Sequence, residues 1–366
     1  MIDLLSAKKT LPIGVDIGHQ SIKMIQLAGR GGSYDILAAC KVDVDPAACV
    51  KPDSRRDFVV SAVKEILNDG DFHGSSAVIG IPNDDVRITS IRVTDSETED
   101  MNQVINKDLY ERFDLDPQED SIKYIYAGDV KEAEQLKKEL VLFGTSSDVV
   151  NENITILESA GLVPVAIEPV PAALFRSVDS LLKQDSDPDQ TLVVVDVGSS
   201  YTTIVLGRYG EIGFVKALRT GTSEFASEIA KRLDVSPDQA AVLRRSMLDG
   251  AGNAAAAGPG RVYDISVDQA LMDAVRSVAE RIAKEIALCL RYYTVTFRGK
   301  RVEKIVLSGG GAYEDHMADV IGGRLAVDVE PARFSAKLSL TEQVCDDENP
   351  LSEWAAALGL SLYGNK

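Results

Sequence analysis

Two aspartates with similar neighbours are the residues of this sequence best suited to do chemistry. Residues 13–27 read IGVDIGHQSIKMIQL, and residues 193–206 read VVVDVGSSYTTIVL. Aligned on Asp16 and Asp196, both segments have a β-branched run, the aspartate, an aliphatic residue, a glycine, two polar residues and a second apolar run. These runs predict two strands joined by a tight glycine turn in each copy.

Such a turn suits phosphate and metal chemistry. Its glycine lets a ligand approach the backbone, and successive N–H groups form a concavity that binds anions. The aspartate offers an oxygen ligand to a hard cation that bridges phosphate oxygens, directly or through water. A single Asp-x-Gly hairpin is usually only a turn, so Asp16 and Asp196 could be simple turn residues. The repetition of the whole context favours the phosphate interpretation.

Composition and motifs exclude several other classes of function. The chain has 366 residues, 45% hydrophobic and 26% charged, which suits a globular protein with room for two lobes. Its net charge of −18 argues against nucleic acid or an anionic lipid surface as the main partner. No apolar run approaches the roughly 20 residues of a membrane span, and the polar N-terminus does not suit a signal peptide. A G-x-x-x-x-G-K-[ST] P-loop is absent.

Cysteine and histidine usage gives no sign of a metal or redox centre. The four cysteines lack metal-binding or redox spacing, and the three histidines are scattered along the chain. Cys289 lies on an apolar helical face and is expected to be core packing. This usage suits a reducing cytoplasm.

The first half of the chain predicts a lobe with an insertion. Strand-like runs up to residue 44 precede a helix at 58–69 and a buried strand at 75–82. Residues 83–160 then form a β-α-β-β-α segment, whose first helix is predicted to begin with a capping box of Ser96 and Glu99.

The first lobe ends with a strand and a helix at 163–182, which a polar linker at 183–190 follows. The second lobe then repeats the plan of the first, beginning with the second aspartate hairpin. A long amphipathic helix is predicted at 267–293, and residues 303–325 read as a strand, a triple-glycine turn and a helix. The glycines permit close approach of a flat ligand, and the N-terminus of the following helix would attract phosphate. Residues 350–366 predict a C-terminal helix of small residues.

Five segments in this order resemble the signatures of the actin/Hsp70/sugar-kinase superfamily, whose members clamp a nucleotide between two related halves. The segments are 13–23, 163–176, 193–203, 305–313 and 350–362. The resemblance implies an α/β actin-like ATPase fold with two duplicated RNase H-like lobes around a nucleotide cleft. The implied lobes are 1–182, with an inserted FtsA-like subdomain at 83–160, and 191–349, while 350–366 returns to the first lobe.

Within the superfamily, the chain resembles the PilM family of type IV pilus assembly proteins, which are relatives of the cell-division protein FtsA. The resemblance covers essentially the whole chain and includes DIGxxSIK, AGLVPVAIEPVPAAL, IVLSGGGA and the small insertion. It implies a cytoplasmic ATP-binding adaptor that is peripheral to the inner membrane. The implied partner is a PilN-like membrane protein, bound through its N-terminal peptide near the inserted subdomain. Pilus motor ATPases and a homo-oligomeric ring are further implied associations.

The resemblance also assigns roles to individual residues. Asp16 and Asp196 would hold Mg²⁺ beside ATP. The phosphates would contact Gly18, His19, Gln20, Ser21 and Lys23 from the first lobe and Gly198, Ser199 and Ser200 from the second. The nucleoside side of the site would include Gly221, Arg244, Gly309, Gly310, Gly311 and Tyr313. Glu168 would be the catalytic residue that orders Mg²⁺ and the attacking water.

Blander roles remain open for some of these residues. Glu168 could be a surface or cap residue, Lys23 could pair with any acidic neighbour, and His19 could point to solvent. Two departures from the family pattern also weaken the site. His19 stands where Ser or Thr is usual, and Ala241 replaces a glutamate that usually contacts the ribose, while Arg244 keeps the cation. The resemblance still implies ATP binding, and because of the two departures hydrolysis is expected to be slow or absent.

Three alternatives to the adaptor interpretation remain. A sugar-kinase-like phosphotransferase would need a general base near the cleft, and no additional aspartate motif fills that role. A filament-forming protein similar to FtsA or MreB is a second alternative, although the C-terminal SLYGNK is not the basic amphipathic anchor of FtsA. A nucleotide-free scaffold is the third, supported by His19 and Ala241.

Overall fold

The computed structural model describes most of the chain. The described residues are 9–30, 33–45, 52–98, 100–105, 107–132, 135–182, 191–208, 210–237, 239–244, 265–297, 302, 304–314, 316–336, 338–339 and 351–365. The predicted low-complexity loop at 250–260 and the linker at 183–190 lie outside these ranges. None of the described helices is long and apolar enough to cross a membrane.

The first sheet has six strands in the order β14-β3-β2-β1-β4-β8. The strands are β1 (Lys9–Ile17), β2 (Ser21–Arg30), β3 (Ser33–Asp43), β4 (Ser76–Ile81), β8 (Val163–Pro169) and β14 (Leu338–Ser339). β1, β2 and β3 pair antiparallel, whereas β4 and β8 continue the sheet in parallel from β1. Helix α1 (Pro52–Asp69) and helix α5 (Ser147–Ser159) cover one face, where Val59, Val63 and Leu157 pack against strand residues.

The second sheet repeats this plan with five strands in the order β11-β10-β9-β12-β13. The strands are β9 (Leu192–Val197), β10 (Thr202–Arg208), β11 (Glu211–Leu218), β12 (Lys304–Ser308) and β13 (Asp328–Pro331). The first three again pair antiparallel, and β12 and β13 again extend the sheet in parallel from β9. Helices α9 (Ile265–Phe297) and α10 (Met317–Leu325) cover its outer face, and α7 (Ser223–Leu233) packs against α9.

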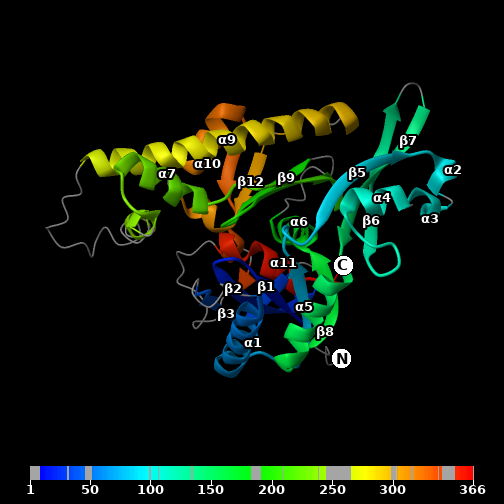
Figure 1. Cartoon of the computed structure of the whole chain (residues 1–366), viewed down its shortest axis with the longest axis horizontal. Helices are drawn as coiled ribbons and strands as arrows, with labels where there is room; N and C mark the ends of the chain where they lie inside the picture. Colours follow the sequence, from blue (N-terminus) through cyan, green and yellow to red (C-terminus); the bar gives the residue numbers. More distant parts are fainter. Residues whose placement is uncertain are drawn as a thin grey trace, which may run out of the picture.

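Two helices fill the space between the sheets, α6 (Val170–Leu181) and α11 (Ala355–Ser361) (Figure 1). One core cluster joins Leu27 of β2, Leu174 of α6, Val194 of β9 and Leu358 of α11. The two helices approach each other at Gly359, where an added Cβ would lie 1.8 Å from the carbonyl oxygen of Ala173. Because glycine has no side chain, the two backbones can meet at this point.

The insertion is a three-stranded antiparallel sheet in the order β5-β7-β6. Its strands are β5 (Arg87–Val93), β6 (Ser121–Glu132) and β7 (Gln135–Thr145), and its helices are α2 (Asp95–Thr98), α3 (Met101–Val104) and α4 (Lys107–Phe113). One face packs its own small core around Phe113 and Leu142. The other face, through Val141 and Phe143, joins the core cluster that contains α6.

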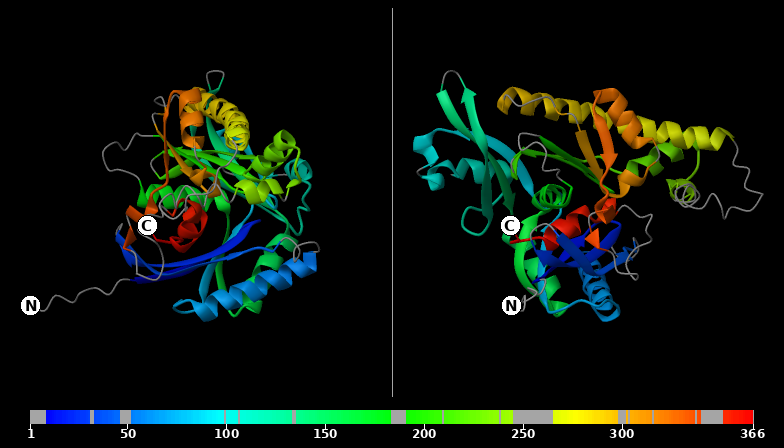
Figure 2. Two further views of the ribbon diagram at one scale, coloured as in Figure 1. Left: turned by 90° about the vertical axis from the view of Figure 1, so that its left-hand side faces the viewer. Right: turned by 180° about the vertical axis from the view of Figure 1, so that it is seen from behind.

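A buried ion pair attaches the insertion to the far end of α9, which lies beside it in Figure 2. Glu139 of β7 is 1% exposed and accepts hydrogen bonds from Arg92 Nε at 2.8 Å and from the Tyr292 hydroxyl at 2.6 Å. Arg92 also bonds Glu132 at 2.7 Å. A buried carboxylate needs such partners, so this group of residues fixes the insertion against the second sheet.

The start of the insertion differs in part from expectation. Glu99 of the predicted capping box lies outside the described residues, and Thr94 and Glu97 bond reciprocally through their side chains and backbone N–H groups. The single helix expected there is three short helices, α2, α3 and α4. The pattern between residues 96 and 113 contained no signal for these breaks.

Two later segments also differ from expectation. The triple-glycine turn leads into a 3₁₀ helix, η2 (Gly310–Tyr313), and α10 begins only at Met317, so the N-terminus of α10 does not follow the glycines directly. Strand β14 was not predicted and pairs with β3 of the first sheet, although its residues were assigned to the second lobe. A two-residue parallel edge strand has no sequence pattern of its own.

The glycine at the α6–α11 contact allows a test of this packing. We expect Gly359→Ala to destabilise the protein by about 3 kcal/mol, because the methyl group would force the two backbones apart. Gly323→Ala in α10 is the matched control, since its Cβ would meet nothing within 4 Å. That change should stabilise by about 0.5–1 kcal/mol. Urea unfolding of both variants measures the difference, and equal midpoints would contradict the proposed contact.

Candidate functional site

Asp16 begins a row of charged residues that crosses three neighbouring strands. In the register of the sheet Asp16 of β1 is opposite Lys23 of β2, and Lys23 is opposite Lys41 of β3. Residues paired in this way have side chains on the same face of the sheet. Lys23 Nζ lies 4.0 Å from Asp16 Oδ2 and donates to Ser21 Oγ at 2.8 Å. The row therefore presents one anion and two cations side by side.

Asp196 occupies the equivalent position in the second sheet. It lies near the end of β9, and Ser308 Oγ of β12 donates to its Oδ1 at 2.9 Å. Burial raises the pKa of Asp196 to about 6; the Ser308 hydrogen bond opposes this, and the charge of Asp16 adds to it. Burial also raises the pKa of Asp16, against the lowering effect of Lys23. The two aspartates thus repel each other across the junction of the lobes.

The turns after the aspartates are built alike. The N–H of Gly18 donates to the Ser21 carbonyl at 3.0 Å, and the N–H of Gly198 donates to the Tyr201 carbonyl at 2.9 Å. His19 and Gln20 are exposed in the first turn, and Ser199 and Ser200 are half-buried in the second. Both turns contain the residues predicted to contact phosphate, and those contacts remain predictions.

Gly221 lies directly against the second turn. A Cβ at Gly221 would lie 2.3 Å from the carbonyl oxygen of Ser199. The next two backbone N–H groups, of Thr222 and Ser223, donate to the carbonyls of Gly198 and Ser199 at 2.9 and 3.0 Å. Because Gly221 has no side chain, the start of α7 can pack against the second turn. The predicted contact of Gly221 with the cofactor stays a prediction.

The triple-glycine turn packs against the strand that carries Asp196. Gly309 has φ +80°, and a Cβ there would lie 2.6 Å from the carbonyl of Val197 and 3.0 Å from Asp196 Oδ1. Gly311 touches the Val197 side chain, whereas Gly310 is exposed, with nothing within 4 Å of its Cβ position. Only a residue without a side chain can occupy the strained position at Gly309.

Arg244 and Glu314 connect the predicted nucleoside side of the site. The helical residues 239–244 begin after a capping box of Ser236 and Gln239. Arg244 Nε donates to Glu314 Oε1 at 2.7 Å, and its guanidinium lies 5.2 Å from the centre of the Phe225 ring. Glu314, which follows η2 and is 7% exposed, was not among the predicted residues.

Glu168, the predicted catalytic residue, forms a bidentate ion pair. Arg176 of α6 donates to both carboxylate oxygens, at 2.5 and 2.7 Å, and to the carbonyl of Gly359 at 2.7 Å. Glu168 lies on β8, and β4 separates that strand from the β1 strand of Asp16. This geometry gives the glutamate a structural role beside α11, while its role toward water remains a prediction.

Residues of the loop after β4 connect the two turns, which the sequence reasoning missed. Asp84 Oδ2 pairs with His19 Nε2 at 2.8 Å, so His19 does not point freely to solvent. Burial raises the pKa of Tyr201, and its hydrogen bond to Asp84 raises it further. The neighbouring Asn83 Nδ2 donates to Thr203 Oγ1 at 2.7 Å. The Pro-Asn-Asp-Asp run at 82–85 was the only available signal, and it resembles an ordinary turn.

The residues present fit a magnesium–nucleotide complex. No cluster of three or more His, Cys, Asp or Glu side chains suited to a metal occurs in the described part of the chain. A hard cation held by Asp16 and Asp196 would therefore need further oxygen ligands, as phosphates and water provide for Mg²⁺. A cation there would also relieve the repulsion between the two carboxylates.

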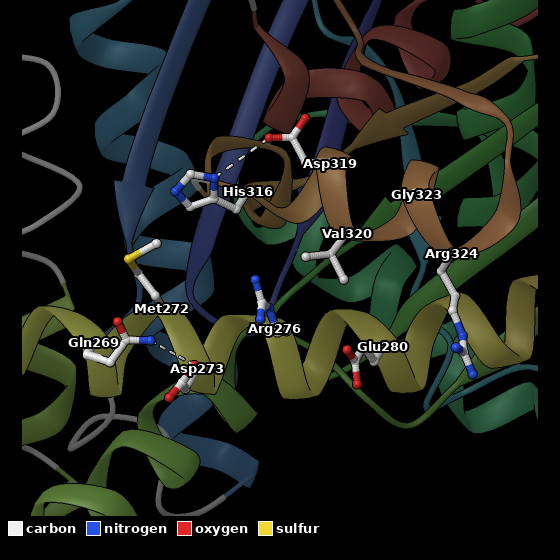
Figure 3. A pocket seen from close by; sticks show the side chains of 10 residues that line it. All are labelled: Gln269, Met272, Asp273, Arg276, Glu280, His316, Asp319, Val320, Gly323 and Arg324. Carbon is white, nitrogen blue, oxygen red and sulfur yellow. Dashed lines mark hydrogen bonds and ion pairs between the residues drawn. The ribbon is translucent and has the colours of Figure 1, made fainter.

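A separate hollow of about 520 Å³ lies on the outer side of the second lobe, between α9 and α10 (Figure 3). Met272, Arg276 and Glu280 line it from α9, and His316 and Arg324 line it from the α10 side. It contains none of the residues predicted for the nucleotide.

The duplicated sheets and paired aspartate turns define an actin-like ATPase fold, and solved structures support this class. A structure described as a PilM–PilN type IV pilus biogenesis complex is 20% identical, covers 97% of this chain and 98% of that chain, and has a TM-score of 0.75. The ethanolamine utilization protein EutJ from Carboxydothermus hydrogenoformans is 15% identical, with 97% and 90% covered and a TM-score of 0.57. The predicted fold class is thereby confirmed.

The family follows from the sequence match. The model of a family described as type IV pilus assembly protein PilM matches residues 14–256, which include the first turn, the insertion, the connecting segment and the second turn. The chain belongs to the PilM family of type IV pilus assembly proteins. The family predicted from the motifs is confirmed.

The raised pKa of Asp196 makes stability depend on pH. The folded state holds the proton of Asp196 more tightly than the unfolded state, so this group destabilises the protein as the pH rises from about 4 through about 6. Without ligand and in EDTA, Asp196→Asn should therefore raise the free energy of unfolding by about 3 kcal/mol at pH 7.5 and by about half as much at pH 5.

Urea unfolding at the two pH values measures this dependence. Asp71→Asn is the matched control, because Asp71 is an exposed aspartate in the loop after α1. A gain for Asp196→Asn that is the same at both pH values would contradict the prediction.

Proposed function

We propose that the chain is a cytoplasmic, ATP-binding adaptor of a type IV pilus, or related type II secretion, assembly platform. The observation that supports nucleotide binding best is the pair of half-buried aspartates from equivalent turns of two duplicated sheets. Two like charges that are largely removed from water are costly, and Lys23 offsets only part of this cost, which favours a ligand that brings a further cation to the pair. Family membership supports the same conclusion.

Each turn would have a definite task in binding Mg²⁺–ATP. Asp16 and Asp196 would hold the metal, which supplies electrostatic stabilisation of the phosphates when bound. The backbone of the first turn and Lys23 would contact phosphate from one lobe, and Ser199 and Ser200 from the other. The exposed Gly310 leaves space for the nucleoside beside Tyr313.

Binding is a better-supported function than hydrolysis. Glu168 would have to order the attacking water, but Arg176 already holds both of its carboxylate oxygens. A carboxylate whose two oxygens both accept hydrogen bonds from arginine has fewer lone pairs left to orient a water molecule. We therefore infer that ATP acts mainly as a bound ligand and that its hydrolysis is slow or absent.

The proposed partner is a PilN-like inner-membrane protein, which would bind through its N-terminal peptide at the edge strand β8. The solved complex that resembles this chain contains PilN, which supports the choice of partner. Val163 and Val165 on β8 are 54% and 49% exposed, although they are apolar. Ile167 of the same strand packs against the core cluster that contains Phe143 of the insertion, so this edge adjoins the insertion.

An exposed edge strand binds an extended peptide well. Its outward backbone N–H and C=O groups can pair with a further strand, and alternate side chains provide specificity. The bound peptide would connect the adaptor to the membrane, which makes it peripheral to the inner membrane through its partner. A ring of copies and contact with pilus motor ATPases stay predictions.

Calorimetric titration with Mg²⁺–ATP tests the nucleotide site. We expect wild-type binding near the micromolar range, and Asp16→Ala should weaken it by about tenfold or more because a metal ligand is lost. Asp319→Ala, which removes an exposed aspartate that is not among the predicted site residues, should bind as the wild type does. Equal affinities of all three proteins, or no binding by the wild type, would refute the proposed site.

Fluorescence anisotropy with a labelled N-terminal peptide of the cognate PilN-like protein tests the partner surface. Val165→Asp should weaken peptide binding by about tenfold, because it places a charge on the apolar edge. The control is Met272→Asp, because Met272 is 43% exposed in the N-terminal part of α9, away from the end that contacts the insertion. Mg²⁺–ATP binding should be unchanged in both variants. Undiminished peptide binding by Val165→Asp would exclude β8 as the docking edge.

A further inference from the structure

The C-terminal part of the chain places a carboxylate beside the two lysines of the aspartate row. Glu353 belongs to the short helix η4 (Ser352–Trp354), which immediately precedes α11. Its Oε2 lies 2.9 Å from Lys41 Nζ and 3.8 Å from Lys23 Nζ. The Glu353 side chain is 19% exposed and that of Lys23 is 10% exposed, so water screens this group of charges only partly.

Backbone contacts hold Glu353 in this position from both sides. The carbonyl of Ser352 accepts a hydrogen bond from the N–H of Gly309 at 3.0 Å, and Ser352 Oγ donates to the carbonyl of Ala332 at 2.6 Å. The N–H of Glu353 also approaches the Tyr313 hydroxyl at 3.5 Å. The helix η4 is thus connected to the triple-glycine turn, the element expected to contact the nucleoside.

The two lysines need an anion between them. Lys23 and Lys41 are directly opposite on neighbouring antiparallel strands, and like charges in that arrangement repel. One oxygen of Glu353 lies within 4 Å of both ammonium groups and offsets this repulsion. A phosphate oxygen could serve in the same way, since lysine ammonium groups bind phosphate as point charges. Both anions cannot occupy the same place.

We propose that Lys41 together with Lys23 forms a phosphate subsite, and that Glu353 occupies this subsite until a nucleotide phosphate displaces it. This inference rests on the proposed nucleotide function and adds two residues to it. When phosphate binds, the carboxylate of Glu353 moves away from the lysines, and the pull is transmitted to η4 and to the beginning of α11. Nucleotide binding thereby changes the packing of the C-terminal segment between the lobes.

Trp354 reports this movement, because it follows Glu353 directly. It is the only tryptophan of the chain, and its side chain is 7% exposed in the cluster that joins both sheets. Mg²⁺–ATP should change the tryptophan emission of the wild type. Glu353→Gln, in which the lysines no longer hold the segment, should start nearer to the emission of the nucleotide-bound state and change less.

Calorimetry of four proteins measures the competition itself. Glu353→Gln should bind Mg²⁺–ATP about fivefold more tightly than the wild type, because a partly exposed ion pair no longer has to be broken. Lys41→Ala should change the affinity for Mg²⁺–ATP little in the wild-type background. There the variant loses the phosphate contact, but it also loses the ion pair with Glu353 that phosphate would have to break. In the Glu353→Gln background the same change should cost about tenfold, because only the phosphate contact is then lost.

The control removes a similar ion pair elsewhere. Glu330→Gln breaks the pair with Lys304 on neighbouring strands β12 and β13 and should leave affinity and tryptophan emission unchanged. Pyrophosphate with Mg²⁺ is a second probe, and it should show the same order of affinities without a nucleoside.

The possible outcomes separate this inference from the proposed function. Equal Mg²⁺–ATP affinities for wild type and Glu353→Gln, with no change of tryptophan emission, would overturn the inference and leave the nucleotide site intact. Lack of binding by every variant would overturn both. Binding by Glu353→Gln alone would support the inference strongly, since the carboxylate would then be what excludes the nucleotide.

Discussion

The site is built around two carboxylates that are largely removed from water. Asp16 and Asp196 are held at corresponding positions of two sheets, and burial raises the pKa of both. Two neighbouring carboxylates of this kind destabilise a folded protein unless other groups compensate for their desolvation. Lys23 and Ser308 offset part of this cost, at 4.0 and 2.9 Å. The part of the desolvation cost that these two groups do not offset is consistent with a cation that binds between the lobes.

The packing around this pair keeps the two sheets close enough for the carboxylates to interact. α6 and α11 fill the space between the sheets, and they meet at Gly359 without a side chain between them. The carbonyl oxygen of Gly359 also accepts a hydrogen bond from Arg176, and Arg176 in turn binds the carboxylate of Glu168. The central helices are therefore connected to a charged residue of the connecting segment as well as to the cores of both sheets.

A second group of contacts attaches the insertion to the helix that covers the second sheet. Glu139 and Arg92 of the insertion are bonded to Tyr292 and Thr296 of α9, which covers the second sheet. The insertion thus has a core of its own and contacts with both lobes. A change in the angle between the sheets would alter the environment of the β8 edge, where the partner peptide is proposed to bind.

Prediction from sequence succeeded where local pattern and local structure coincide. The two Asp-x-Gly turns follow from period, turn chemistry and glycine placement, and the helix predicted at 267–293 is observed as α9. It failed at the three short helices of the insertion and at β14. Those depend on packing and on a distant partner strand, which local propensity does not specify.

The fold class, the family and the two aspartates could be inferred from the sequence alone, because these depend on residue types repeated at fixed spacing. The charges that surround the aspartates are brought there by the folding of the whole chain. Lys41 and Glu353 are 312 residues apart, and sheet register together with the return of the C-terminal segment brings them to 2.9 Å. Likewise, Arg176 donates hydrogen bonds to both carboxylate oxygens of Glu168, and Asp84 pairs with the imidazole of His19. Such pairings depend on the positions of whole elements, so a linear pattern does not contain them.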